Sequence, residues 1–161
     1  MGSDRMAFYE SLKAIFLHID NHEKAFLSQY SLSLPRFYAL LHISNHPGIN
    51  YIDLSDLMLC TKSNTTRIVQ GMQKDHLVDR KNHPADGRSY QLYLTETGAS
   101  LYECVYPEYV NLVDQLMSLF TDDELTTYAM VSQHIESTLD PKSGSLPTRL
   151  NTTAKAVPVE I

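Results

Sequence analysis

The feature that most constrains this chain is a change in the spacing of its apolar residues close to residue 76. Before this point apolar residues recur every three or four positions, which predicts helices that bury one face. Residues 89–94 instead alternate polar and apolar side chains, and residues 77–82 also have the pattern of a strand. Residues 83–88 contain a proline and an Asp-Gly pair, which predict a turn. The expected fold is therefore mainly α with one small β-hairpin (α+β).

Six helical segments are predicted along the chain, four before the hairpin and two after it. Apolar stripes predict a long first helix over residues 5–30 and further helices that begin near residues 34, 51, 62, 96 and 122. A residue suited to an N-cap precedes each of these five: Ser33, Asn50, Thr61, Thr95 and Thr121. Because the third and fourth helices are only a few residues apart and the hairpin follows them, the order is that of a winged helix-turn-helix.

Charge is distributed unevenly along the chain. The whole chain carries a net charge of −6, which argues against a nucleic-acid partner. Residues 62–90 alone hold six Lys or Arg residues against three Asp residues, so this stretch is +3 and the remainder is −9. Because salt screens charges beyond about 10 Å, local charge decides the attraction to phosphate. Taken alone, an ordinary solvated surface explains this stretch better than a nucleic-acid contact does.

The fourth helix has two opposite faces at about 100° per residue. Its apolar face is formed by Thr65, Ile68, Val69 and Met72. Its polar face is formed by Ser63, Arg67, Gln70 and Lys74. Arginine and glutamine can hydrogen-bond the edges of guanine and adenine, and serine and lysine can hold phosphates. A helix of this kind, second in a helix-turn-helix pair, suits the major groove of DNA.

Several short motifs follow one another in a characteristic order. They are Leu34-x-x-Phe37-x-x-Leu40-x-x-Ile43, His46-Pro47-Gly48-Ile49, Thr66-Arg67-Ile68-Val69 with Met72, Leu77-Val78-x-Arg80, Asp86-x-Arg88-Ser89 and Leu94-Thr95-Glu96-x-Gly98. In this order and spacing the chain resembles the MarR family of bacterial transcriptional regulators over about residues 5–140. Three positions depart from the family pattern: Gln70-Gly71 stands where an Asp-Arg pair is common, and His76 stands where glycine is common.

The resemblance implies an intertwined homodimer. Residues 1–33 and 96–140 would form the helical dimerisation region, residues 34–95 the winged helix-turn-helix DNA-binding domain, and residues 141–161 a tail or arm. The long apolar stripes of the first and fifth helices agree with this, because the middle segment can cover only part of them. A two-fold dimer would read a pseudo-palindromic operator in double-stranded DNA, with the fourth helix in the major groove and the hairpin tip in the minor groove.

Carried over to matching positions, the resemblance and the polar face together predict twelve DNA-contacting residues. They are Lys62, Ser63, Asn64, Thr66, Arg67, Gln70, Lys74, Arg80, Asp86, Gly87, Arg88 and Ser89. Because Gln70-Gly71 replaces the common pair, the base preference of a typical family member does not transfer.

The resemblance also implies a small lipophilic or phenolic effector bound between the dimerisation helices and the winged region. Five aromatic residues fall near that junction: Phe16, Phe26, Tyr30, Phe37 and Tyr38. Aromatic residues at helical spacing more often belong to a core than to a pocket, so packing is the favoured alternative for them.

Cysteine and histidine suggest no further site. Cys60 and Cys104 form no CxxC pair, and we expect both to be passive. His18 and His22, like His42 and His46, are four residues apart on a helix, which is a spacing that suits zinc. His42 and His46 lie opposite the apolar side of the second helix, and His18 lies off the apolar stripe of the first, so no metal and no cofactor are expected.

The sequence thus predicts a sequence-specific DNA-binding regulator, a repressor that a small molecule releases from its operator. The alternatives are a winged-helix dimerisation module without DNA binding and a metal-responsive member of the same family. Motifs for nucleophilic, carboxylate or nucleotide chemistry are absent from the sequence, so an enzyme is not expected. No apolar run approaches the ~18 residues that span a membrane, and a cytoplasmic location is expected.

Overall fold

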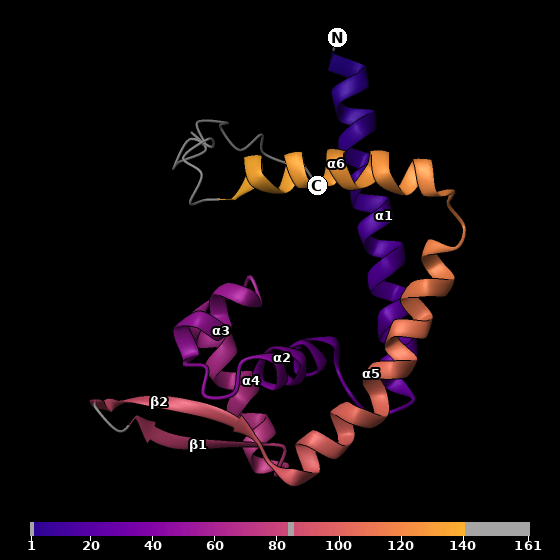
Figure 1. Ribbon diagram of the computed structural model, residues 1–161. Coiled ribbons are helices and arrows are strands. Elements are labelled where there is room, and N and C mark those ends of the chain that lie inside the picture. The colour runs from indigo at the N-terminus through magenta and orange to yellow at the C-terminus, as the bar shows by residue number, and fades with distance from the viewer. Residues whose placement is uncertain (1, 84–85, 141–161) are drawn as a thin grey trace, which may run out of the picture. The chain divides into compact units, whose positions relative to one another are not determined.

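The computed structural model describes the backbone of residues 2–83 and 86–140 and the side chains of residues 4–82 and 90–140. These residues form six helices and one antiparallel hairpin (Figure 1). The elements are α1 (Gly2–Ser28), α2 (Leu34–Asn45), α3 (Tyr51–Leu57), α4 (Lys62–Lys74), β1 (Val78–His83), β2 (Asp86–Leu94), α5 (Glu96–Met117) and α6 (Asp122–Leu139). The mainly α fold with a small β-hairpin is confirmed. The chain divides into two compact units between Leu112 and Val113, and each is described by itself.

Four of the five expected helix caps are confirmed, and one of them is Thr95, whose hydroxyl accepts the backbone N–H of Gly98. Asn50 accepts the backbone N–H groups of Ile52 and Asp53, and Thr61 accepts that of Asn64. In the second unit, Thr121 and Glu124 form the expected capping box at the start of α6. Ser33 occupies the expected N-cap position of α2, but its side chain makes no capping hydrogen bond.

The expected element boundaries need two corrections. α1 spans residues 2–28 rather than 5–30, and Ser31 follows it at φ 53°. The expected turn over residues 83–88 is too long, because His83 pairs with Asp86 and the strands reach further toward the tip. The register shifts between Asn82 and His83, so β2 carries more residues there than β1. Turn-forming residues can lie within a paired strand when a bulge accommodates them.

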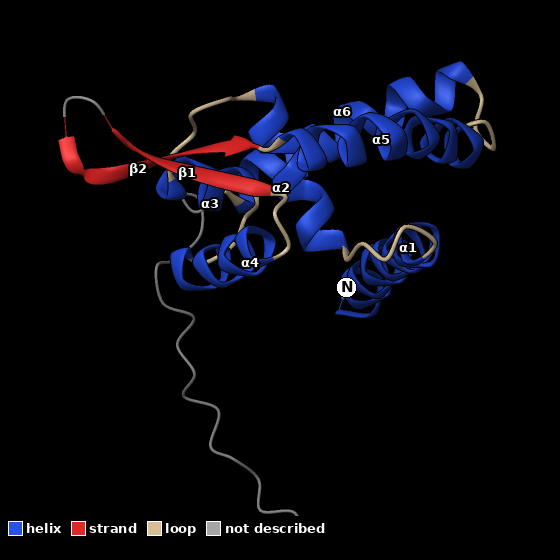
Figure 2. Cartoon of the chain, turned by 90° about the horizontal axis from the view of Figure 1, so that it is seen from below, coloured by secondary structure: helices blue, strands red, loops and turns tan. Residues whose placement is uncertain are grey.

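The hydrophobic core lies among α2, α3, α4 and the hairpin. Its fully buried large side chains are Leu27, Phe37, Leu40, Ile43, Leu54, Val69, Met72, Val78, Leu92 and Val105. Val105 brings α5 onto this core, and Leu27 brings the end of α1. The loop before α3 joins the sheet through Ile49, which pairs with Leu92 of β2. Figure 2 shows the strands beside the short helices that they help to cover.

A tight junction connects α4, β1 and α5. The backbone N–H of Leu77 donates to the carbonyl of Met72, and that of His76 donates to Gln73, which is the Schellman pattern at a helix end. This pattern places the residue after the cap in the left-handed region, and His76 adopts φ 55°. His76 therefore occupies a position whose backbone conformation suits glycine best.

Thr95 and Gly98 dock the start of α5 onto this junction. The Thr95 hydroxyl donates to the His76 carbonyl and accepts the backbone N–H of Gly98 at 3.0 Å. The Thr95 N–H donates to the Leu77 carbonyl at 3.1 Å. A Cβ at position 98 would lie 2.0 Å from that same carbonyl oxygen. Only glycine permits this approach, which gives the Thr-Glu-x-Gly motif a structural reason.

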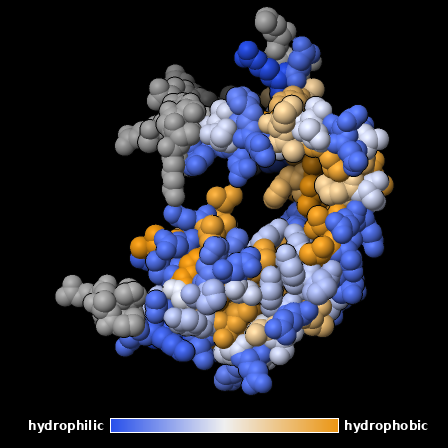
Figure 3. All heavy atoms as spheres, in the orientation of Figure 1, coloured by the Kyte–Doolittle hydropathy of each residue, from blue (hydrophilic) through white to orange (hydrophobic). Residues whose placement is uncertain are grey.

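Large apolar side chains remain at the surface in both units (Figure 3). In the first unit α1 exposes Met6, Phe8, Tyr9, Ile15, Phe16, Leu17 and Ile19. In the second unit α6 buries none of its residues and exposes Tyr128, Met130, Val131 and Leu139. Apolar surface of this extent is typical of helices that meet a partner.

Candidate nucleic-acid interface

The two expected faces of α4 are confirmed. Thr65, Val69 and Met72 are fully buried and hold the helix on the core, and Ile68 is partly buried against it. On the other side Ser63, Arg67, Gln70 and Lys74 are all exposed. The buried face therefore fixes the helix while the polar face remains open to a ligand.

Side-chain contacts at the start of α4 organise part of the polar face. Arg67 donates from Nη2 to Oδ1 of Asn64 at 3.1 Å, so these two predicted contact residues lie together. Asn64 in turn donates to Sγ of Cys60 at 3.6 Å. The Thr66 hydroxyl donates to the Lys62 carbonyl at 2.8 Å, so it is engaged with the helix backbone. A guanidinium held in this way loses little rotamer freedom when it binds.

Strand β1 carries two cations that each lie against an aromatic ring of β2. The guanidinium of Arg80 lies 4.4 Å from the ring centroid of Tyr90, and the ammonium of Lys81 lies 4.8 Å from that of Tyr93. Burial raises the pKa of Tyr51, and Arg80 beside it acts in the opposite direction. Arg80 is thus positioned by aromatic groups from both α3 and the hairpin. The side chains of Asp86, Gly87, Arg88 and Ser89 lie outside the described residues.

Four of the five aromatic residues predicted to bind an effector come together. Phe26 lies 5.3 Å from Tyr30 and Phe37 lies 5.9 Å from Tyr38, measured between ring centroids. Tyr109 of α5 completes the cluster, 4.6 Å from Phe37 and 6.4 Å from Phe26. Phe16 does not join them, because its side chain is 64% exposed on α1.

Sequence reasoning missed a buried carboxylate at this cluster. Glu23 is only 7% exposed and accepts hydrogen bonds from Tyr38 Oη at 3.1 Å and Tyr109 Oη at 2.6 Å. Burial and the hydrogen bond to Glu23 raise the pKa of Tyr109, and burial also raises that of Tyr38. The three side chains come from α1, α2 and α5, whose packing no local sequence signal reveals.

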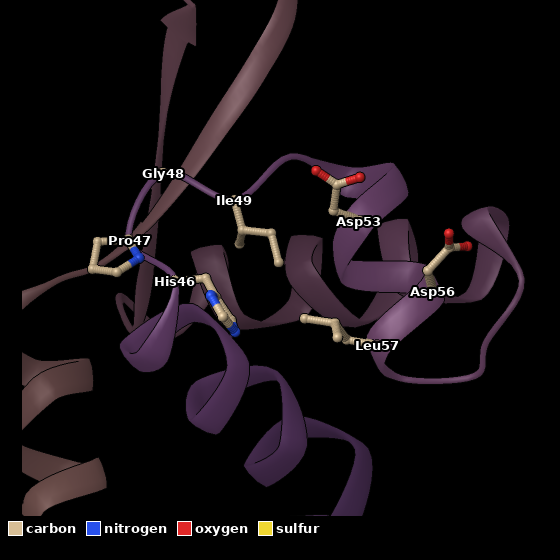
Figure 4. A pocket seen from close by; sticks show the side chains of 7 residues that line it. All are labelled: His46, Pro47, Gly48, Ile49, Asp53, Asp56 and Leu57. Carbon is tan, nitrogen blue, oxygen red and sulfur yellow. The ribbon is translucent and has the colours of Figure 1, made fainter. Parts of the chain in front are cut away.

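The surface of the described residues includes two hollows. The larger, of about 590 Å³, is lined by His46, Pro47, Gly48, Ile49, Asp53, Asp56 and Leu57 (Figure 4). The smaller, which we call the Gly71 cleft, is about 260 Å³ and is lined by Ser33, Pro35, Arg36, Arg67, Ile68 and Gly71. Neither contains any of the five aromatic residues, and the effector site stays a prediction.

Histidine and cysteine side chains form no metal site among the described residues. Among residues 2–83 and 86–140 no three His, Cys, Asp or Glu side chains gather in a way that could hold a metal ion. The rings of His42 and Tyr38 stack with their centroids 6.4 Å apart, and burial lowers the pKa of His42. Cys60 is half-buried and Cys104 is exposed, and both are free thiols. None of the described helices has the length and apolar character to cross a bilayer.

Comparison with known protein sequences identifies relatives of this chain. A sequence model described as "MarR family" matches residues 32–90. The chain is 28% identical over 119 residues to the uncharacterized HTH-type transcriptional regulator YsmB of Bacillus subtilis, covering 74% of this chain and 82% of that protein. It is 27% identical over 125 residues to the transcriptional repressor MprA of Escherichia coli, covering 76% and 70%.

The fold also has close structural counterparts. A crystal structure of a mutant MarR from E. coli complexed with operator DNA superposes with a TM-score of 0.76 at 20% sequence identity. The match covers 82% of this chain and 95% of that protein, so the similarity extends well beyond the segment that the family model matches.

Proposed function

The chain belongs to the MarR family, and from this premise we propose that it regulates transcription by binding double-stranded DNA as a homodimer. The observation that carries the proposal is the polar face of α4. Two cations and two hydrogen-bonding side chains are exposed on a helix whose opposite face packs on the core through the buried Thr65, Val69 and Met72. This helix follows α3 after a short turn and precedes the hairpin, which is the order a major-groove helix and a wing require.

The unpartnered apolar surfaces support the dimer. Seven large apolar side chains of α1 are exposed, and α6 has no buried residue within the chain. A second copy that covers both surfaces would bury more than about 2,000 Å² in total, as obligate dimers do. Residues 1–33 and 96–140 would supply this interface, and residues 34–95 would carry the DNA contacts. Sedimentation showing a stable monomer at micromolar concentration would contradict this part of the proposal.

We further propose that the protein acts as a repressor in the cytoplasm, where a bacterial regulator meets its operator. The repressor name of the relative MprA supports the sign of regulation. The relatives are named as regulators, and no catalytic role is proposed.

A small lipophilic or phenolic effector would release the protein from DNA by binding beside the aromatic cluster. Phe26, Tyr30, Phe37 and Tyr38 connect α1 with the DNA-binding segment there. A ligand that separates these helices would change the spacing of the two α4 helices from the ~34 Å of one DNA turn.

The test begins by selecting bound fragments from the source genome and measuring affinity for them. Replacing Arg88 with alanine should weaken binding by about 1–3 kcal/mol, most strongly where the flanks are rich in A·T pairs, since a narrow minor groove attracts arginine. Arg67→Ala should instead relax the preference at one base pair in each half-site. Small, equal losses for both variants on every sequence would mean that neither reads DNA.

The second candidate function is a winged-helix interaction module that does not bind DNA. The net charge of −6 and the Gln70-Gly71 pair favour it. The two functions differ in salt dependence, because only DNA binding releases counterions and weakens steeply as salt rises. If selection recovers no fragment, and the remaining affinity for any DNA duplex does not change with salt, the interaction module becomes the better account.

A further inference from the structure

The Gly71 cleft lies beside the polar face of α4 and has no assigned role. Gly71 is four residues after Arg67, so it lies one turn further along nearly the same side of the helix. A Cβ built at position 71 meets no atom within 4 Å, so the space above the helix backbone is open there. The cleft is therefore an opening in the surface next to the proposed DNA-reading face.

Two arginines from different helices border this opening. Arg67 comes from α4, and Arg36 comes from the first turn of α2. The Arg36 side chain is 26% exposed and donates from Nη2 to Oδ2 of Asp75, an ion pair that holds it in place. Two cations against one carboxylate leave the cleft region positive, although the whole chain is acidic.

Arg36 also keeps hydrogen-bonding capacity. A guanidinium has five N–H donors in a rigid fork, which suits phosphate. The Arg36 Nε is shielded from solvent and has no hydrogen-bond partner among the described residues. Ser33 also lines the cleft, and its hydroxyl makes no capping bond to α2. Arg36 and Ser33 are among the residues that line the cleft, whose space of about 260 Å³ is smaller than the ~300–1,000 Å³ that a small-molecule site occupies.

We propose that the Gly71 cleft binds one backbone phosphate of the operator, with Arg36 as the main ligand from outside the helix-turn-helix. The inference rests on the proposed DNA binding of α4. A helix in the major groove is flanked by phosphates, and such contacts fix its register without reading sequence. Because position 71 carries no side chain, a phosphate can approach the α4 backbone, and α2 supplies the cation from across the gap.

The test uses two variants that break the same ion pair. Arg36→Gln removes the guanidinium, whereas Asp75→Asn keeps it and removes only the carboxylate. If the pair has only a structural role, both variants should weaken DNA binding alike. If Arg36 binds phosphate, the two variants should differ, because Asp75→Asn leaves the phosphate ligand in place.

Affinity of the full-length dimer for a selected DNA duplex is measured across a series of potassium chloride concentrations. Arg36→Gln should lower affinity about tenfold at low salt and reduce the salt slope by about one per half-site. Asp75→Asn should bind at least as tightly as the parent protein. Lys24→Gln is the matched control, since it removes one exposed cation of α1 and should leave the slope unchanged. Circular dichroism establishes that each variant is folded.

A second pair of variants probes the opening itself. Gly71→Asp and Gly71→Asn have the same shape and differ only in charge. The aspartate variant should bind DNA at least fivefold more weakly than the asparagine variant, and this difference should shrink when Arg36→Gln is also present. Additive effects of the two changes would show that they do not act on one phosphate and would overturn the inference.

The remaining outcomes separate the inference from the function on which it rests. Equal losses for Arg36→Gln and Asp75→Asn, or an unchanged slope for Arg36→Gln, overturn the phosphate contact while the parent protein still binds DNA. Failure of the parent protein to bind any duplex overturns both. Titration with inorganic phosphate in the absence of DNA tests the other source of the same anion. If Arg36→Gln abolishes that binding but leaves the DNA salt slope intact, the cleft is a free-anion site and the DNA contact is rejected.

Discussion

Replacing Gly98 with alanine should destabilise the protein although alanine is the better helix former. In the interior of an unhindered helix, glycine to alanine gains about 1 kcal/mol. At position 98 the new methyl group would lie 2.0 Å from the Leu77 carbonyl oxygen and 2.9 Å from its carbon. A relaxed carbon–oxygen contact is about 3.3 Å or longer, so α5 and the junction must move apart by more than 1 Å, estimated from that contact distance.

Such movement disturbs more than one contact. The Leu77 carbonyl is the acceptor for the Thr95 N–H, and the Thr95 hydroxyl accepts the Gly98 N–H. Overpacking of this kind costs about 1–3 kcal/mol, and each weakened hydrogen bond costs about 0.5–1.5 kcal/mol. After the gain in helix propensity is subtracted, we expect a net loss of about 2 kcal/mol in the free energy of unfolding.

Gly71→Ala is the matched control for this prediction. It makes the same chemical change inside α4, where a Cβ meets no atom within 4 Å, and it should stabilise the protein by about 1 kcal/mol. Both variants are compared by urea denaturation at one protein concentration, because the stability of a dimer depends on concentration. If Gly98→Ala shifts the unfolding midpoint upward, or if both variants shift it alike, the close approach at Leu77 does not control the junction.

Three further predictions follow from the same contacts. His76→Gly should raise the free energy of unfolding by about 1 kcal/mol, since glycine adopts the left-handed backbone at φ 55° without strain, and denaturant titration measures the gain. The raised pKa values of Tyr38 and Tyr109 mean that the stabilisation from their neutral hydroxyls is complete below about pH 10, their unfolded value, and is lost as the pH rises above it. Tyr109→Phe should lower stability at pH 7 by about 1 kcal/mol and flatten this alkaline loss, which thermal unfolding across pH values would detect. Val131→Glu places a charge on an exposed apolar side chain of α6 and should shift sedimentation toward the monomer, and an unchanged dimer would exclude that surface from the interface.

Local sequence patterns were sufficient to determine the elements of this fold. Capping residues such as Thr121 and Asn50 act on the first turn of their own helix, so their roles follow from neighbours three residues away. The two faces of α4 follow from its 3.6-residue period, since a helix can bury only one stripe. The hairpin was also predicted, but its turn was placed too widely, because pairing across a bulge extends strands through residues that favour turns.

The candidate site depends on contacts that no local pattern contains. Glu23 and Tyr109 are separated by 86 positions, and their hydrogen bond exists because α1, α2 and α5 pack together. Arg36 meets Asp75 across 39 positions, and the Gly71 cleft opens between two helices that the sequence pattern places only in order. Periodicity and capping are short-range effects that fix each element by itself. Which side chains from distant elements lie together is decided by how those elements share one core, and that is a property of the tertiary structure alone.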